Sequence, residues 1–173
     1  MKQIIQLGDP VLEKQSIEIE DVNSKEIQEL IDEMLRIVEV KEESTAGLSA
    51  PQIGKNLRVA ICRRMDLKDE DENPRWEIMI NPKLIYKSPE TTTFWEGCLS
   101  IKKGDLFGRV TRPKRVTVEF LDRKGNSKTL DADEYFSHVV QHEVDHLDGI
   151  LFLKYVLDPK ELYTAKELDK MSE

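Results

Sequence analysis

Residues 133–147 carry the pattern that most limits how this chain can fold. At helical spacing, about 100° per residue, this segment has an apolar stripe formed by Phe136, Val139, Val140, Val144 and Leu147. Glu143 falls in the middle of the stripe. Burying a lone carboxylate costs several kcal/mol unless another group compensates the charge. The sequence therefore predicts a helix whose buried face contains a polar site.

Two histidines flank this glutamate. His142 and His146 lie four residues apart, which places them on one helix face with Cβ atoms about 5–6 Å apart. Both imidazoles can then reach one metal ion, and Glu143 can act as a general base. The alternative is an ordinary helix with two structural histidines and a salt-bridged glutamate. His138 lies too far along the helix axis to share the ion with His146, and we interpret it as a residue of the pocket rim or the surface.

Two segments elsewhere in the chain offer further polar groups. Catalytic zinc-type sites use three protein ligands, and Cys98 is the best third candidate because a thiolate binds such metals strongly. The alternative is a small buried apolar residue, the interpretation that we favour for Cys62. Gln52 offers an amide donor that can stabilise an oxyanion. Its alternative is a surface glutamine in a tight turn.

Length, charge and composition exclude several classes of protein. A chain of 173 residues fits one domain, residues 1–173, with a single core. The net charge of -8 argues against nonspecific nucleic-acid binding. No stretch approaches the ~20 apolar residues of a membrane span, and the N-terminus lacks a signal-peptide pattern. We expect a cytoplasmic protein of bacterial type; an organellar protein that has lost its leader is the alternative.

The remaining pattern predicts segregated helices and strands. We expect a helix over residues 24–40 with Ser24 as its N-cap, and a third, amphipathic helix over about 159–171. The expected strands are 57–62, 76–80 (ended by Asn81-Pro82), 115–122 and 127–130, the last two forming a hairpin; residues 66–74 form an exposed loop. The predicted fold class is α+β: antiparallel sheets packed around the helix of the His-Glu-x-x-His motif, with an N-terminal and a C-terminal helix.

Together these segments resemble the peptide deformylase family. Residues 141–149 (QHEVDHLDG) and 96–100 (EGCLS) match two motifs of that family completely. Residues 45–52 (TAGLSAPQ) match a third in part, and the resemblance runs from residue 1 to about Tyr155. It implies that Cys98, His142 and His146 bind the metal.

The resemblance also implies roles at the substrate. Glu143 would be the general acid and base, while Gln52 and the backbone N–H of Leu99 would hold the developing oxyanion. The implied substrate-binding residues are Ala46, Gly47, Glu96 and His138. Of these, Gly47 would pair with the substrate backbone and Glu96 would brace the second motif.

The implied reaction is removal of the N-formyl group from the N-terminal formyl-methionine of newly made polypeptides, with release of formate. The implied cofactor is one divalent ion, ferrous iron, with zinc, nickel or cobalt as alternatives in purified protein. The implied partners are N-formyl-methionyl peptides and, transiently, the ribosome, with no membrane and no specific nucleic acid.

The chain departs from the family pattern at three places. Thr45 replaces a glycine, and a β-branched residue is disfavoured at positive φ. Ser49 replaces an alanine, which is tolerated if the hydroxyl is hydrogen-bonded. Residues 101–105 (IKKGD) stand where Pro-Gly is common. Two alternatives stay open: a metalloprotease with Glu161 or Glu167 as third ligand, and a deformylase-like binding module impaired in catalysis.

Overall fold

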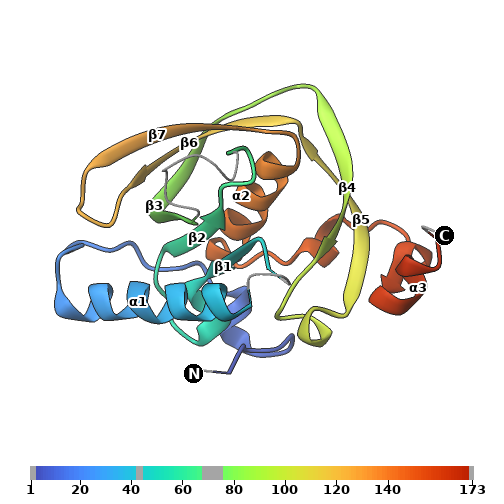
Figure 1. Ribbon diagram of the computed structural model, residues 1–173, viewed down its shortest axis with the longest axis horizontal. Helices are drawn as coiled ribbons and strands as arrows, with labels where there is room; N and C mark the ends of the chain where they lie inside the picture. Colours follow the sequence, from blue (N-terminus) through green and yellow to red (C-terminus); the bar gives the residue numbers. More distant parts are fainter. Residues whose placement is uncertain (1–2, 42–44, 68–75, 172–173) are drawn as a thin grey trace.

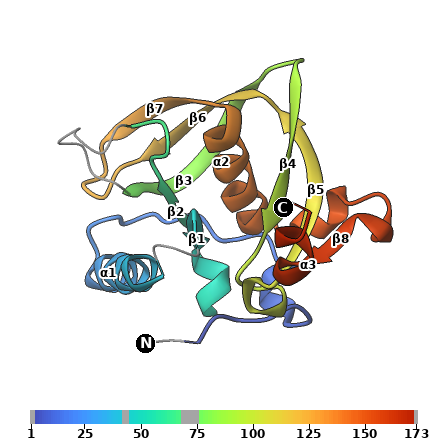
Figure 2. The same cartoon turned by 45° about the vertical axis from the view of Figure 1, so that its right-hand side comes forward.

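Two antiparallel sheets lie on either side of one helix. The structure, a computed structural model, describes residues 3–41, 45–67 and 76–171. The larger sheet has the strand order β1-β2-β3-β6-β7: β1 (Gly47–Ser49), β2 (Val59–Arg63), β3 (Trp76–Lys87), β6 (Arg115–Leu121) and β7 (Ser127–Asp133). The smaller has the order β4-β5-β8: β4 (Thr91–Gly97), β5 (Leu106–Pro113) and β8 (Leu162–Thr164). Helix α2 (Glu134–Leu147) lies between the larger sheet and the β4–β5 pair (Figures 1 and 2), which confirms the predicted α+β class.

Two more helices and five short 3-10 turns complete the described elements. Helix α1 (Lys25–Val40) lies beside β1 and β2, and α3 (Ala165–Asp169) lies outside β5 (Figure 1). The 3-10 turns are Pro10–Glu13, Ala50–Ile53, Lys102–Gly104, Phe152–Tyr155 and Pro159–Glu161. Within the described residues, no helix is both long enough and apolar enough to cross a bilayer.

Helix α1 confirms the prediction for residues 24–40. Its apolar residues at helical spacing are buried in a core shared with β1 and β2; they include Ile27, Ile31, Met34 and Val38. Ser24 occupies the N-cap position, but its side chain makes no capping hydrogen bond. Packing of the apolar face, more than the cap, therefore stabilises this helix.

The β6–β7 hairpin and α2 were also predicted correctly. Alternate residues of β6 are buried in a second core cluster together with Phe136 and Val140 of α2; they are Val116, Val118 and Phe120. Gly125 adopts φ 82 in the connecting turn, a conformation that glycine tolerates best. This packing of α2 on the sheet fixes which face of the helix remains for the site.

Strand β3 corrects the prediction that Asn81-Pro82 ends a strand at residue 80. The strand continues to Lys87, with a register shift between Ile80 and Lys83 in its pairing with β6. Asn81 adopts φ 52, and its side chain exchanges hydrogen bonds with the backbone of Ile19, at 2.8 and 2.9 Å. These long-range bonds support a bulge that carries the strand past the proline.

The predicted C-terminal helix is present, but its expected extent of about 159–171 is wrong. Residues 162–164 form strand β8, which pairs with β5, and only Ala165–Asp169 are α-helical. The sequence also did not predict the β4–β5 hairpin. Most of the predicted exposed loop, residues 68–74, lies outside the described residues.

Candidate active site

Three residues that were predicted as metal ligands come together at the end of β4. Cys98 follows that strand directly, and His142 and His146 occupy successive turns of α2. One ligand atom from each lies within 4.8 Å of the other two, and Cys98 Sγ is 3.2 Å from His146 Nε2. Cys98 and His146 are buried, and His142 is largely so. The sulfur therefore faces the two imidazoles.

The donor set fits a divalent ion such as zinc or ferrous iron, because one thiolate and two imidazoles suit both. Glu96 accepts a hydrogen bond from Nδ1–H of His142, which leaves Nε2 of that ring, in its neutral form, to bind a metal. Burial lowers the pKa of His146 well below its usual range, with the nearby His142 charge acting in the same direction. That imidazole is thus held neutral, which is the form that binds a metal.

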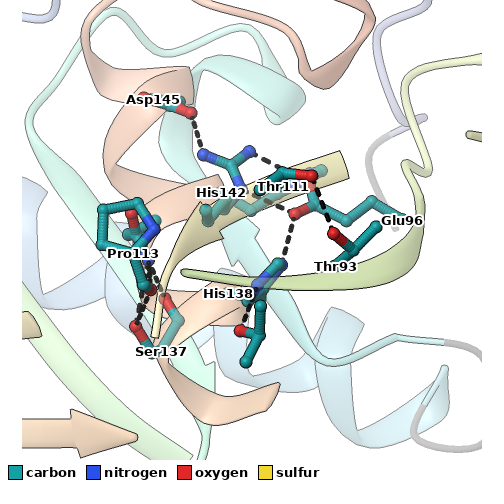
Figure 3. Close-up of polar contacts among 11 residues, drawn as sticks. Thr93, Glu96, Thr111, Pro113, Ser137, His138, His142 and Asp145 are labelled. Atoms are coloured by element: carbon teal, nitrogen blue, oxygen red, sulfur yellow. Dashed lines mark hydrogen bonds and ion pairs between the residues drawn. The ribbon is translucent and has the colours of Figure 1, made fainter. Parts of the chain in front are cut away.

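Glu96 stands at the centre of a buried hydrogen-bond network (Figure 3). Its two carboxylate oxygens accept from Arg112 Nε at 2.6 Å and Nη2 at 3.0 Å, and from His138 Nδ1 at 3.0 Å and His142 Nδ1 at 2.9 Å. Arg112 Nη1 also donates to Asp145 Oδ2, at 2.6 Å. Burial by itself would raise the pKa of Glu96, but the bonds from both histidines and Arg112 hold that pKa well below its usual range. Glu96 is therefore a fixed anion that orients a metal ligand.

His138 corrects the prediction of a rim or surface residue. Its side chain is 1% exposed and forms part of the cavity wall, with Nδ1 bonded to Glu96 and Nε2 to Thr92 at 3.1 Å. Both ring nitrogens are occupied by protein groups, which excludes it as a metal ligand in this arrangement. Arg112 and Asp145 had no predicted role, because their contacts with Glu96 and with each other join segments that are far apart in the sequence.

Glu143 is buried as the helix periodicity predicts, and it is poorly compensated. Within the described part of the chain, its Oε2 has no hydrogen-bond partner. Burial raises the pKa of Glu143 to about 7, although the charge of His142 and the polar Ser49 hydroxyl lower it. A carboxyl group with a pKa near neutrality can both take and return a proton.

Gly47 leaves the space that Glu143 occupies. A Cβ added to Gly47 would lie 2.5 Å from Glu143 Oε1 and 2.7 Å from its Cγ. Any larger residue at position 47 would therefore displace this carboxylate. The sequence predicted only a substrate-pairing role for Gly47, so this steric role was missed.

Gln52 is buried in the turn that follows β1, so the alternative of a surface glutamine is wrong. Its Oε1 accepts from the Ser49 backbone N–H at 2.9 Å and from Ser49 Oγ at 3.1 Å. Its Nε2 donates to Cys98 Sγ at 3.5 Å and to Ser100 Oγ at 3.3 Å. The Gln52 amide nitrogen is thus directed toward Cys98 and Ser100, next to the predicted metal ligands.

A cavity of about 140 Å³ opens onto these groups. Nine of the ten predicted site residues line it, and His146 lies behind them; the lining includes Ala46, Gly47, Leu99 and His138. Aromatic side chains of Trp95, Phe107 and Tyr135, which the sequence did not single out, belong to the same lining.

Comparison with known proteins identifies the family. A sequence model described as polypeptide deformylase matches residues 1–161. The peptide deformylase of Bartonella tribocorum is 38% identical over 156 residues, which cover 90% of this chain and 84% of that protein. The chain belongs to the polypeptide deformylase family.

Solved deformylase structures have the same fold. The peptide deformylase of Synechococcus elongatus, solved in complex with actinonin, superposes with a TM-score of 0.81 at 32% identity, covering 99% of this chain and 88% of that one. A class I type b deformylase of Acinetobacter baumannii, solved with Met-Ala-Ser bound, gives a TM-score of 0.78 at 28% identity, covering 90% and 98%.

The departures from the deformylase pattern are accommodated locally. Thr45 is not among the described non-glycine residues with positive φ, so the expected strain does not arise, and its Oγ1 donates to the Gly47 carbonyl at 2.7 Å. The Ser49 hydroxyl is hydrogen-bonded to Gln52, which is the condition under which serine is tolerated in place of alanine at this buried position. Lys102 and Lys103 adopt φ 49 and 58 before Gly104, so the strain lies in the loop that lacks Pro-Gly.

The metalloprotease alternative is not supported. Among the described residues, the Cys98–His142–His146 cluster includes neither Glu161 nor Glu167. The Glu167 carboxylate instead accepts from Lys170 Nζ at 2.8 and 2.9 Å, within the C-terminal segment.

Proposed function

We propose that this deformylase hydrolyses the formyl amide at the N-terminus of N-formyl-methionyl chains and releases formate. One observation carries the proposal: a cysteine sulfur and two imidazoles converge beside a buried carboxylate, Glu143, that has an oxygen without a partner among the described residues. Cys98, His142 and His146 would hold the ion, and Glu96 would orient His142. Ferrous iron is the ion that we propose, with zinc, nickel or cobalt as substitutes.

When bound, such an ion supplies Lewis acidity, which polarises a carbonyl and lowers the pKa of water. Glu143 takes a proton from the water that attacks the formyl carbon. Gln52 Nε2 and the Leu99 N–H donate to the oxygen on which negative charge develops. Glu143 then gives the proton to the leaving nitrogen as the C–N bond breaks, so that the products are formate and a free amine.

The edge of β1 supports binding of an extended chain. Arg63 N donates to the Ala46 carbonyl, so Ala46 faces β2 and, by the alternation of an antiparallel ladder, the peptide groups of Gly47 face away from it. A substrate strand can pair with Gly47 there while its first side chain enters the cavity. The Acinetobacter relative that binds Met-Ala-Ser agrees with a short peptide as substrate.

Formate release from formyl-Met-Ala-Ser by anaerobically purified protein, with metal analysis of the same sample, tests the proposal. We expect turnover that requires one bound ion per chain. Cys98→Ala should abolish both metal binding and activity. Metal-loaded protein that releases no formate would instead support the binding module. Ribosome association and a cytoplasmic location stay predictions.

A further inference from the structure

Ser49 stands at the end of β1, where the strand turns into the Ala50–Ile53 segment, and its side chain is buried. The backbone N–H and the hydroxyl of Ser49 both donate hydrogen bonds to the same atom, Gln52 Oε1. The backbone N–H and Oγ lie 2.9 and 3.1 Å from Gln52 Oε1. Two donors on this oxygen oppose rotation of the amide, because a reversed amide would place its NH₂ group against them.

The Ser49 hydroxyl has a single proton, and its bond to Gln52 Oε1 uses it. One residue therefore places two donors on the amide assigned to the oxyanion. Ser49 is also the N-cap residue of the Ala50–Ile53 turn, and its bond to Gln52 offsets the cost of burying a hydroxyl. Alanine, the residue that the family pattern has here, would keep the backbone N–H on Gln52 Oε1 and lose only the hydroxyl.

We propose that Ser49 is a positioning residue, whose hydroxyl holds the Gln52 amide in the orientation that the reaction requires. The inference rests on the proposed function, since Gln52 takes its role from it. Its physical basis is that oxyanion donors act only when they are fixed in place before charge develops. Ser49 would then affect the chemical step more than substrate or metal binding.

Ser49→Ala tests the proposal, with Ser88→Ala as the matched control. Ser88 is also a buried serine, but its hydroxyl bonds to the Glu90 carbonyl and the Arg115 N–H in the turn between β3 and β4. For Ser49→Ala we expect kcat for formyl-Met-Ala-Ser to fall about tenfold, with KM, metal content and Tm close to wild type. Ser88→Ala should leave kcat unchanged.

A double-mutant cycle with Gln52→Ala shows whether Ser49 acts through Gln52. If it does, Ser49→Ala should lower kcat less in the Gln52→Ala background than in the wild type. An unchanged kcat in Ser49→Ala, a parallel change in KM, or fully additive effects would overturn the inference while the proposed function stands. Wild-type protein that holds metal and releases no formate would overturn both.

Discussion

Glu96 and Glu143 are two carboxylates buried in the same site, and their surroundings are opposite. Glu96 accepts four hydrogen bonds, from Arg112 and two histidines, whereas Glu143 Oε2 has no partner among the described residues. Desolvation raises the pKa of both. The hydrogen bonds reverse its effect at Glu96, while the pKa of Glu143 rises to about 7.

This difference separates a structural anion from a proton carrier. A carboxylate with every lone pair engaged keeps its charge and fixes its neighbours, here the ligand His142. A carboxylate left short of donors can exchange a proton near neutral pH. Both carboxylates are buried, and the number of hydrogen-bond donors around each one decides whether it acts as a fixed anion or as a proton carrier.

The largest effect is expected at the under-bonded carboxylate. Glu143→Gln keeps the shape of the side chain and removes its capacity to carry a proton, so kcat should fall by roughly 10³-fold or more, while metal stays bound. Formate assays and metal analysis of the variant check this. Glu119→Gln, on the exposed side of β6, is the matched control. Loss of metal together with activity would show that Glu143 has another role.

The same substitution should change the stability of the metal-free protein with pH. The pKa of Glu143 is about 7 in the folded state against a reference of 4.5, so the folded protein binds more protons between these values. Its free energy of unfolding therefore falls as pH rises from about 4.5 to 7, by roughly 3 kcal/mol. Glu143→Gln removes this pH-dependent loss. In denaturant unfolding, the free energy of unfolding of the metal-free variant should exceed that of the wild type by about 3 kcal/mol at pH 8 and should be similar to it at pH 4. Equal differences at both pH values would contradict the assignment.

The fully bonded carboxylate should respond differently. Glu96→Gln weakens the orientation of His142 and leaves the Arg112 charge only partly compensated, so metal affinity should fall about 10- to 100-fold. Competition with a chelator measures this, again with Glu119→Gln as control. Wild-type metal affinity in Glu96→Gln would mean that its network does not orient the ligand.

Periodicity located the helix and the hairpin because their signals are local. The apolar stripe of α2, the Gly125 turn and the alternation in β6 are all contained in short windows of sequence. The continuation of β3 was not predictable in that way, since it depends on bonds between Asn81 and Ile19, 62 residues apart. Likewise Leu162, Ala165 and Leu168 have helical spacing, but pairing with β5 draws residues 162–164 into a sheet.

In the site, too, the features that depend on local sequence were predicted and those that depend on long-range contacts were not. Motif spacing placed Glu143 and the two histidines, while the chemistry of cysteine suggested Cys98 as the third ligand and the resemblance assigned it that role. No spacing rule connects Glu96 with Arg112, which meet only because β4 and β5 pair with their inner faces toward α2. The burial of His138 follows from that network as well.

The smallest effect is expected at the outer end of the Glu96 network. Asp145 is partly exposed and bonds to Arg112 Nη1, while Arg112 keeps both of its bonds to Glu96. Asp145→Asn should therefore lower the free energy of unfolding by only about 1 kcal/mol and leave metal affinity within a few-fold of wild type. Urea unfolding and chelator competition measure the two quantities. A loss of metal affinity as large as that of Glu96→Gln would show that the fixed charge of Glu96 depends on Asp145. The difference between the two buried carboxylates would then depend on residues beyond the direct hydrogen-bond donors of Glu96.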